Sequence, residues 1–153
     1  MDFIVKLESH MIDDPFPVWK HIKNRLSDDT GALANEGLFL GVFDIESENK
    51  MVGAFQIIPW SEHCYQIHGG ILPEYYGHGV EICLHMGKSL FYGSPCLKIV
   101  AIIPEFNKLM INCLKKIGMK QEGVITKSFK KWMKLHDQII FGMTKMEVRL
   151  CHQ

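Results

Sequence analysis

The sequence predicts one mixed α/β domain, in which helices flank a central β-sheet. The 153 residues are enough for one domain with a single hydrophobic core. Segments with strand and helix patterns follow one another in the order β-α-β-β-β-α-β-α-β-β, without an internal repeat, a low-complexity segment or a linker. One of them, Leu97 to Ile103, is an apolar run rich in β-branched residues, which is typical of a central strand buried on both faces.

The chain is expected to begin with a short strand and a helix. Phe3 to Leu7 is a short alternating run and is a plausible first strand. A break rich in Asp and Pro follows, and apolar residues at helical spacing then predict a helix from Val18 to Leu26. Ser27 to Gly31 is expected to be a loop.

The middle of the chain carries the pattern of a β-hairpin. Two apolar runs, Leu38 to Phe43 and Met51 to Ile58, flank the polar segment Glu46 to Lys50. Tyr65 to Leu72 is expected to add a further strand.

The second half alternates helices and strands. In chain order, the expected elements are a helix over Val80–Phe91, the strand Leu97–Ile103, a helix over Asn107–Ile117, and two strands, Met119–Ile125 and Gln138–Met146. Gly118 suits the left-handed position that ends a helix. A basic loop is expected to join the last two strands.

The composition excludes several classes of protein. The chain is 47% hydrophobic and 22% charged, which indicates a globular rather than a disordered protein. No apolar run approaches the ~20 residues needed to cross a bilayer, and the N-terminus has no signal-peptide pattern. Five cysteines without CxxC spacing favour a reduced protein, so a cytoplasmic location is expected.

Charge is unevenly distributed along a chain that is neutral as a whole. Residues 1–95 carry 6 Lys/Arg and 13 Asp/Glu, a net −7, and residues 96–153 carry a net +7. The basic part peaks at Lys127 to Lys134, where Phe129 and Trp132 lie between lysines. Such a segment fits nucleic acid or the phosphates of a nucleotide cofactor, but a solvated loop has the same pattern.

Two glycines, Gly77 and Gly79, flank His78 between the expected strand and the helix that follows. The first backbone N–H groups of a helix bind phosphate through hydrogen bonds and the helix dipole. Glycine allows an anion to approach the backbone, because no Cβ is in the way. A phosphate site and a tight turn without a ligand both remain open from this pattern.

No metal site is expected. The histidines and cysteines that are close in sequence would project from a loop, a turn and a helix without ligand spacing; they are His63, Cys64, His78, Cys83 and His85. Surface histidines and buried cysteines explain them better.

The order of elements, the segment Pro73 to Gly79 and the segment Asn107 to Gly123 together resemble the GNAT superfamily of acetyl-CoA-dependent N-acetyltransferases. The branch that acetylates ribosomal-protein N-termini is the most similar one, and Asp137 before an apolar strand also matches it. The resemblance covers roughly Tyr65 to Met146. It implies a GNAT-like, mostly antiparallel central sheet flanked by helices, with a splayed pair of parallel strands.

The resemblance also implies a cofactor site for acetyl-CoA. The backbone of Gly77, His78 and Gly79 would hold the pyrophosphate. Ile71 and Leu72 would hydrogen-bond the pantetheine arm and polarise the thioester carbonyl. Asn107 would contact the pantetheine or fix its helix, and an ordinary N-cap is the alternative for it.

The chemistry that the resemblance implies is direct attack of a primary amine on the thioester, with a protein group removing the amine proton. By position, Glu62 and His68 are the candidate bases, with His63 behind them. A solvated loop charge is the alternative for Glu62, and a hydrogen-bonded residue inside the sheet is the alternative for His68.

Several positions depart from the GNAT pattern. Glu74 stands where Gln or Arg is usual, and Glu81 would compete with an anion at the helix start. Leu114 stands where many members have a tyrosine that acts as general acid. The departures leave open a second function, a GNAT-like protein without catalysis that serves in assembly. The chain resembles, on His68 to Gly77, GNAT-like proteins of short-tailed phages that act in head assembly or DNA transfer.

In that second function the protein would reside in the host cytoplasm or the virion, and its basic loop would face DNA or a virion protein. Under either function, the segment Asp28 to Glu36 offers no recognisable acceptor pocket.

Overall fold

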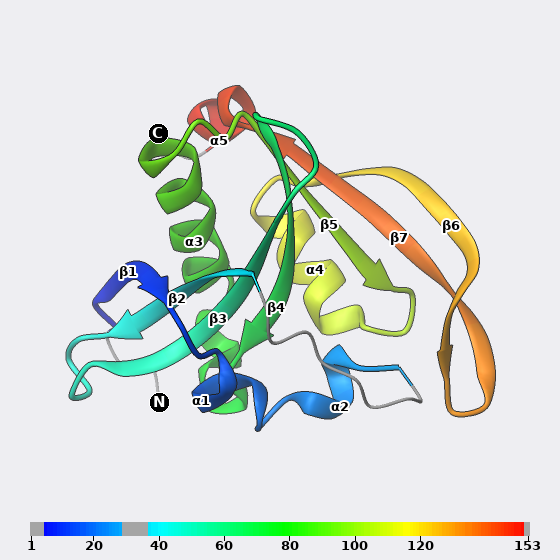
Figure 1. The fold of residues 1–153 in the computed structure, drawn as a ribbon, viewed down its shortest axis with the longest axis horizontal. Coiled ribbons are helices and arrows are strands. Elements are labelled where there is room, and N and C mark those ends of the chain that lie inside the picture. The colour runs from blue at the N-terminus through cyan, green and yellow to red at the C-terminus, as the bar shows by residue number, and fades with distance from the viewer. Residues whose placement is uncertain (1–4, 29–36, 152–153) are drawn as a thin grey trace.

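The computed structural model describes residues 5–28 and 37–151. Its centre is a seven-stranded sheet in the order β1-β2-β3-β4-β5-β7-β6 (Figure 1). All neighbouring strands are antiparallel except β4 and β5, which are parallel. The structure therefore confirms the predicted mixed, mostly antiparallel sheet with one parallel pair.

The strands are β1 (Leu7–Ile12), β2 (Leu38–Asp44), β3 (Lys50–Pro59), β4 (Cys64–Ile71), β5 (Lys98–Pro104), β6 (Lys120–Lys131) and β7 (Lys134–Thr144). The helices are α1 (Phe16–Trp19), α2 (Lys23–Leu26), the 3₁₀ helix η1 (Pro73–His78), α3 (Gly79–Gly93), α4 (Lys108–Lys116) and α5 (Lys145–Cys151). Neither η1 nor α5 was predicted from the sequence. No helix in the described ranges has the length and apolar character needed to span a bilayer.

The N-terminal predictions are wrong in detail. The first strand is β1, which begins where the predicted run Phe3–Leu7 ends, and residues 1–4 lie outside the described ranges. β1 is an edge strand that pairs only with β2, so its side chains show weak alternation. The predicted helix Val18–Leu26 is two short helices, because the chain turns between Trp19 and Lys23. The loop predicted over 27–31 is described only at its first two residues.

The expected β2–β3 hairpin and the central elements are confirmed. Glu48 and Asn49 both adopt positive φ in the turn between β2 and β3. The predicted helix Asn107–Ile117 is α4, and Gly118 after it has φ +101°, as its C-terminal position requires. β5 lies one residue beyond its predicted start and is buried along most of its length.

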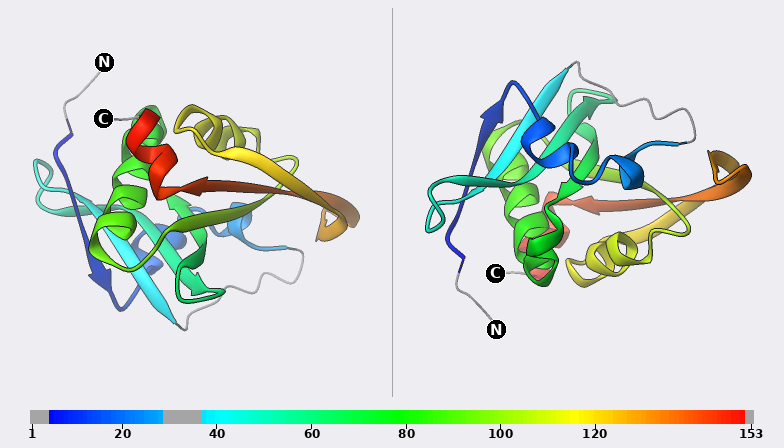
Figure 2. Two further views of the ribbon diagram at one scale, coloured as in Figure 1. Left: turned by 90° about the horizontal axis from the view of Figure 1, so that it is seen from above. Right: turned by 90° about the horizontal axis from the view of Figure 1, so that it is seen from below.

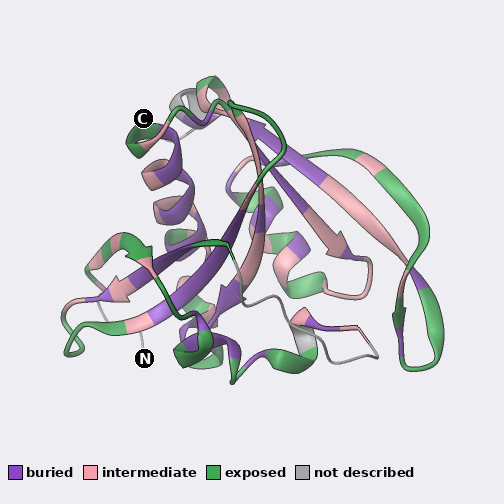
Figure 3. Ribbon diagram, in the orientation of Figure 1, coloured by how far each residue is buried: buried purple, intermediate pink, exposed green. Residues whose placement is uncertain are grey.

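The basic segment Lys127 to Lys134 is not the loop that was predicted. β6 continues to Lys131 and β7 begins at Lys134, so most of the segment lies in a long hairpin. The two turn residues, Trp132 and Met133, have φ of 54° and 58°, the conformation of a two-residue type I′ turn. β6 is exposed at most positions and on both faces, so its sequence lacks the alternation of apolar and polar residues that would indicate a strand (Figure 3).

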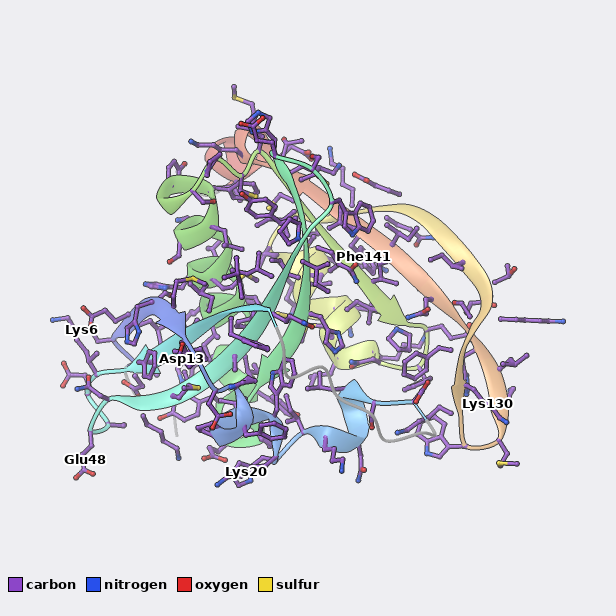
Figure 4. All side chains as sticks on the ribbon, in the orientation of Figure 1. Lys6, Asp13, Lys20, Glu48, Lys130 and Phe141 are labelled. Carbon is purple, nitrogen blue, oxygen red and sulfur yellow. The ribbon has the colours of Figure 1, made fainter. Side chains whose placement is uncertain are left out.

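The sheet separates two helical layers. In the two views of Figure 2, α1 and α2 lie on one face, and α3 and α4 lie on the other. Trp19 of α1 is fully buried, and its indole N–H donates to the Ala54 carbonyl at 2.9 Å. Phe141 of β7 is also fully buried, whereas charged side chains such as Lys20 and Glu48 project from the periphery (Figure 4). The core therefore extends along both faces of the central strands.

Candidate active site

β4 and β5 run side by side for only three residues and then diverge. Their parallel register joins Cys64 to Lys98, Tyr65 to Ile99 and Gln66 to Val100. No ladder continues beyond Gln66, and the two strands separate toward their C-terminal ends (Figure 1). This confirms the predicted splayed pair of parallel strands.

Two adjacent cavities occupy the opening. The larger has a volume of about 300 Å³ and the smaller about 210 Å³. Both are lined by Leu26, Gly69, Asn107 and Met110, so they share a wall. The smaller cavity continues past Gly79 at the start of α3. A ligand that followed both cavities would therefore run from the beginning of α3 into the gap between β4 and β5.

The larger cavity passes through the sheet. Cys83 and Met86 of α3 line it from one face, and Leu26 of α2 lines it from the other. Most proteins close a sheet with continuous hydrogen bonds, so such a passage exists only where neighbouring strands separate. Two molecules that enter from opposite faces can therefore meet inside it.

The splayed edge of β4 presents backbone groups to the cavities. The Leu72 amide donates to the Val52 carbonyl of β3 at 2.8 Å. Alternation along an antiparallel ladder then directs the backbone groups of Ile71 and Gly69 away from β3, toward the opening. Of the two residues expected to hold a pantetheine arm, Ile71 lines the smaller cavity and Leu72 lines neither.

Gly69 is a site residue that the sequence analysis missed. A Cβ there would lie 2.2 Å from the Ala54 carbonyl oxygen, so β4 approaches β3 more closely than any other residue allows. Gly69 lines both cavities. A glycine inside a strand pattern marks such a close approach, and Gly69-Gly70 was the available signal.

The turn before α3 differs from the tight glycine turn considered from the sequence. η1 leads directly into α3, and the Gly79 amide donates to the Tyr76 carbonyl. Gly79 lines the smaller cavity, whereas Gly77 and His78 lie outside both. A Cβ at Gly77 would meet nothing within 4 Å, so the space beside its backbone is open.

The two carboxylates near this turn are paired and lie outside both cavities. Glu74 accepts a 2.6 Å hydrogen bond from the Lys50 ammonium, and this bond lowers the pKa of Glu74. Glu81 lies 3.0 Å from Nδ1 of His78. The repulsion that Glu74 would exert on an anion at the turn is therefore reduced by its partner.

The two candidate bases lie in different environments. His68 lines the larger cavity, and its ring meets that of Trp19 edge-on at a centroid distance of 5.8 Å. Burial lowers the pKa of His68, so its ring is neutral at pH 7 and able to accept a proton. The Glu62 side chain is 83% exposed, lines neither cavity and lies 3.9 Å from His63.

Asn107 is the N-cap of α4, which was one of the two roles considered for it. Its side-chain oxygen accepts a 3.3 Å hydrogen bond from the Met110 amide, which caps α4. The same residue lines both cavities. Two polar residues that sequence reasoning missed, Asn112 and Lys116, line the smaller cavity from α4. Their spacing of four residues on one helical face was the only signal.

Solved structures with a similar arrangement of strands and helices include several acetyltransferases. A GNAT-family acetyltransferase from Bacillus anthracis has a TM-score of 0.68 at 22% identity, over 95% of this chain and 100% of that one. The ribosomal-protein-S5-alanine acetyltransferase of Vibrio fischeri has a TM-score of 0.69 at 15% sequence identity, and the match covers 94% of this chain and 95% of that one. The spermidine N-acetyltransferase of Vibrio cholerae, in complex with CoA and spermine, has a TM-score of 0.75 at 14% sequence identity. The match covers 94% of this chain and 98% of that one. The chain has the GNAT fold. No protein-family model and no curated protein matches the sequence.

Within this GNAT fold, the position of the expected tyrosine is apolar. Leu114 is 4% exposed and lines the larger cavity together with Met119. Neither side chain can donate a proton. Among the described residues that line the larger cavity, His68 is the one whose side chain has a basic nitrogen.

Proposed function

We propose that the protein transfers an acetyl group from acetyl-CoA to a primary amine by direct attack of the amine on the thioester. The observation that carries the proposal is the passage between β4 and β5, which continues to the start of α3. The GNAT fold supports acetyl transfer in general.

In this proposal the cofactor lies along both cavities. Its diphosphate approaches the backbone at Gly77 to Gly79. The two glycines have no side chain that could block it, and the dipole of α3 favours a negative charge there. Lys116 supplies a positive charge at the smaller cavity. The pantetheine arm follows Ile71 and Gly69, whose backbone groups face the opening.

The chain's own groups then have separate tasks in the reaction. Backbone N–H groups of β4 stabilise the negative charge that develops on the thioester oxygen. His68, neutral at pH 7, removes the proton of the attacking amine directly or through one water, and as the C–N bond forms the C–S bond breaks and CoA leaves as its thiolate. The apolar walls exclude water from the thioester, which favours transfer over hydrolysis.

Isothermal titration with acetyl-CoA tests the proposal. We expect saturable binding with a dissociation constant in the micromolar range or tighter, and no heat of binding at high micromolar cofactor would contradict it. Gly77→Trp should abolish binding. The open space beside Gly77 accommodates the new side chain, so the variant should still fold, but the indole fills the space that the phosphates need. Gly93→Trp is the matched control, since a Cβ at Gly93, at the far end of α3, also meets nothing within 4 Å.

The alternative, a GNAT-like assembly protein without catalysis, makes a different prediction for the same variant. It requires the biological activity to survive Gly77→Trp. The basic hairpin proposed for its DNA or virion partner retains exposed lysines at Lys127, Lys130 and Lys134. Lys131, by contrast, is buried, and its ammonium donates to the Ser27 carbonyl at 2.7 Å.

A further inference from the structure

The even-numbered residues of β4 face α1 and α2. A Cβ at Gly70 would lie 2.7 Å from Ile22, which lies between α1 and α2, and the ring of Trp19 meets that of His68 at 5.8 Å between centroids. Because side chains alternate between the faces of a strand, Gln66 lies on this face as well. The helix α3, where the proposed cofactor path begins, lies on the opposite face, and the smaller cavity is lined from both faces.

Strand pairing extends this face across the opening. Gln66 pairs with Val100 of β5, and alternation along β5 leads from Val100 to Pro104. Pro104 pairs with Gln138 of β7. Since paired residues project on the same face, Gln138 shares the face of Gln66 and His68.

The wall of the larger cavity on this face is polar at three positions and uncharged. Gln66, His68 and Gln138 line it, and burial keeps His68 neutral at pH 7. Its apolar members on the same side include Leu26, Ile102 and Pro104. Among the described residues, no Asp, Glu, Lys or Arg lines the larger cavity.

The charged residues near this wall that the structure describes lie outside the larger cavity. Glu105 lies 3.6 Å from Nδ1 of His136 and also accepts the Asp137 amide. The Asp137 carboxylate accepts a backbone N–H of β6 at 2.9 Å. Asp28 follows α2, is partly buried and lines neither cavity.

We infer that the acceptor is a primary amine on an apolar, otherwise uncharged carrier, and that polyamines are poor acceptors. The inference rests on the proposed acetyl transfer and names its substrate class. A polyamine would bring further ammonium groups into a cavity that no carboxylate of the described residues lines, and burial of an unpaired charge is strongly unfavourable. An acceptor with a single amine becomes neutral when its ammonium group loses one proton to His68, so no unpaired charge of the acceptor stays in the cavity. A shared fold does not fix the acceptor, so the spermidine acetyltransferase with this fold is no obstacle.

Steady-state assays of the full chain with acetyl-CoA and three acceptors test the inference. The acceptors are 2-phenylethylamine, a C-terminally amidated tetrapeptide of Ala followed by uncharged residues, and spermidine, and mass spectrometry detects the acetylated products. We expect kcat/KM for at least one of the first two to exceed that for spermidine about tenfold or more. The two uncharged-carrier arms distinguish a small-molecule amine from a peptide N-terminus.

Gln138→Glu adds one carboxylate to the wall with almost no change in shape. It should raise kcat/KM for spermidine and lower the preference for the apolar acceptor about tenfold. Gln121→Glu is the matched control, because Gln121 is exposed on β6 and outside both cavities. It should leave the preference unchanged.

The two proposals fail in different ways. Absence of acetyl-CoA binding overturns the proposed function and, with it, the acceptor class. Binding and turnover with spermidine as the preferred acceptor overturn the acceptor class alone. An unchanged preference in Gln138→Glu also overturns it, since the added charge would then lie away from the acceptor.

Discussion

The hydroxyl of Tyr75 donates a 2.9 Å hydrogen bond to the carboxylate of Asp44, a residue that is fully buried. The bond joins η1, which leads into α3, to the end of β2. It connects the segment that leads into α3 to the sheet. The position proposed for the diphosphate therefore depends on a buried polar pair that lies outside both cavities.

Removal of this hydrogen bond should destabilise the protein. Tyr75→Phe leaves a buried carboxylate without one of its donors, so we expect the free energy of unfolding to fall by about 1–3 kcal/mol. Urea unfolding at pH 7 measures the change. Tyr92→Phe is the control, because Tyr92 is 57% exposed, and it should change stability by less than about 0.5 kcal/mol. Equal stability of Tyr75→Phe and the original chain would contradict this role.

The same pair predicts a pH dependence. Burial alone would raise the pKa of Asp44, but hydrogen bonds from Tyr75, Ser47 and backbone amides outweigh it, and the pKa is lowered. A lowered carboxyl pKa contributes stability that is complete above the unfolded value, about 3.9, and is lost as pH falls through the folded value. The stability difference between the original chain and Tyr75→Phe should therefore be largest at neutral pH and shrink below about pH 4. A constant difference down to pH 2 would contradict it.

His68 should control the reaction rate but not cofactor binding. We expect His68→Gln to lower kcat by about 100-fold or more, with the dissociation constant of acetyl-CoA unchanged within about twofold. Because its pKa is lowered, kcat should decline on the acidic side of pH 6.5 in the original chain and lose this decline in the variant. Glu62→Gln is the comparison, and its exposed side chain should leave kcat unchanged. A larger loss of kcat in Glu62→Gln than in His68→Gln would contradict the assignment of His68 as the base.

Lys116 should contribute to cofactor affinity through its charge. Lys116→Glu reverses the charge beside the smaller cavity and should weaken CoA binding about tenfold, or 1.4 kcal/mol, at low salt. The effect should decrease at 0.5 M salt because exposed charges are screened. Lys115→Glu makes the same change on the adjacent residue, which lines neither cavity. Equal effects of the two variants would show a general charge effect and contradict the assignment.

The β6–β7 turn offers a stabilising change. Met133 is 83% exposed and has φ +58°, a conformation that costs about 1 kcal/mol for a residue with a Cβ. We expect Met133→Gly to raise the free energy of unfolding by up to about 1 kcal/mol, reduced by the greater flexibility of glycine in the unfolded chain. Met146→Gly, at an exposed position of α5, should instead destabilise. A loss of stability in Met133→Gly would contradict a type I′ turn.

The parts of the fold that the sequence predicts well are those with a strong local pattern. Leu97 to Ile103 reads as a buried strand because both of its faces meet protein, and it is β5. The N-terminal helix is wrong because the burial of Trp19 and Ile22 follows from contacts with the sheet rather than from a helical stripe. The prediction of a basic loop is wrong because β6 is exposed on both faces and therefore lacks an alternating apolar pattern.

The candidate site could be predicted beside the turn before α3 but not across its strands. Gly79 and Ile71 lie close in sequence to a recognisable turn, and both line the smaller cavity. Gln138 becomes part of the site only through the pairing of β5 with β7, more than sixty residues after β4. Lys116 also joins the site only through the packing of α4 beside α3. Local pattern carries no information about such long-range contacts.

A crystal structure with bound CoA tests the central claim most directly. We predict continuous ligand density from the start of α3 into the gap between β4 and β5, with the diphosphate at the Gly77–Gly79 backbone and the pantetheine beside Ile71. CoA bound elsewhere on the molecule, or a gap that stays empty at saturating CoA, would contradict the account.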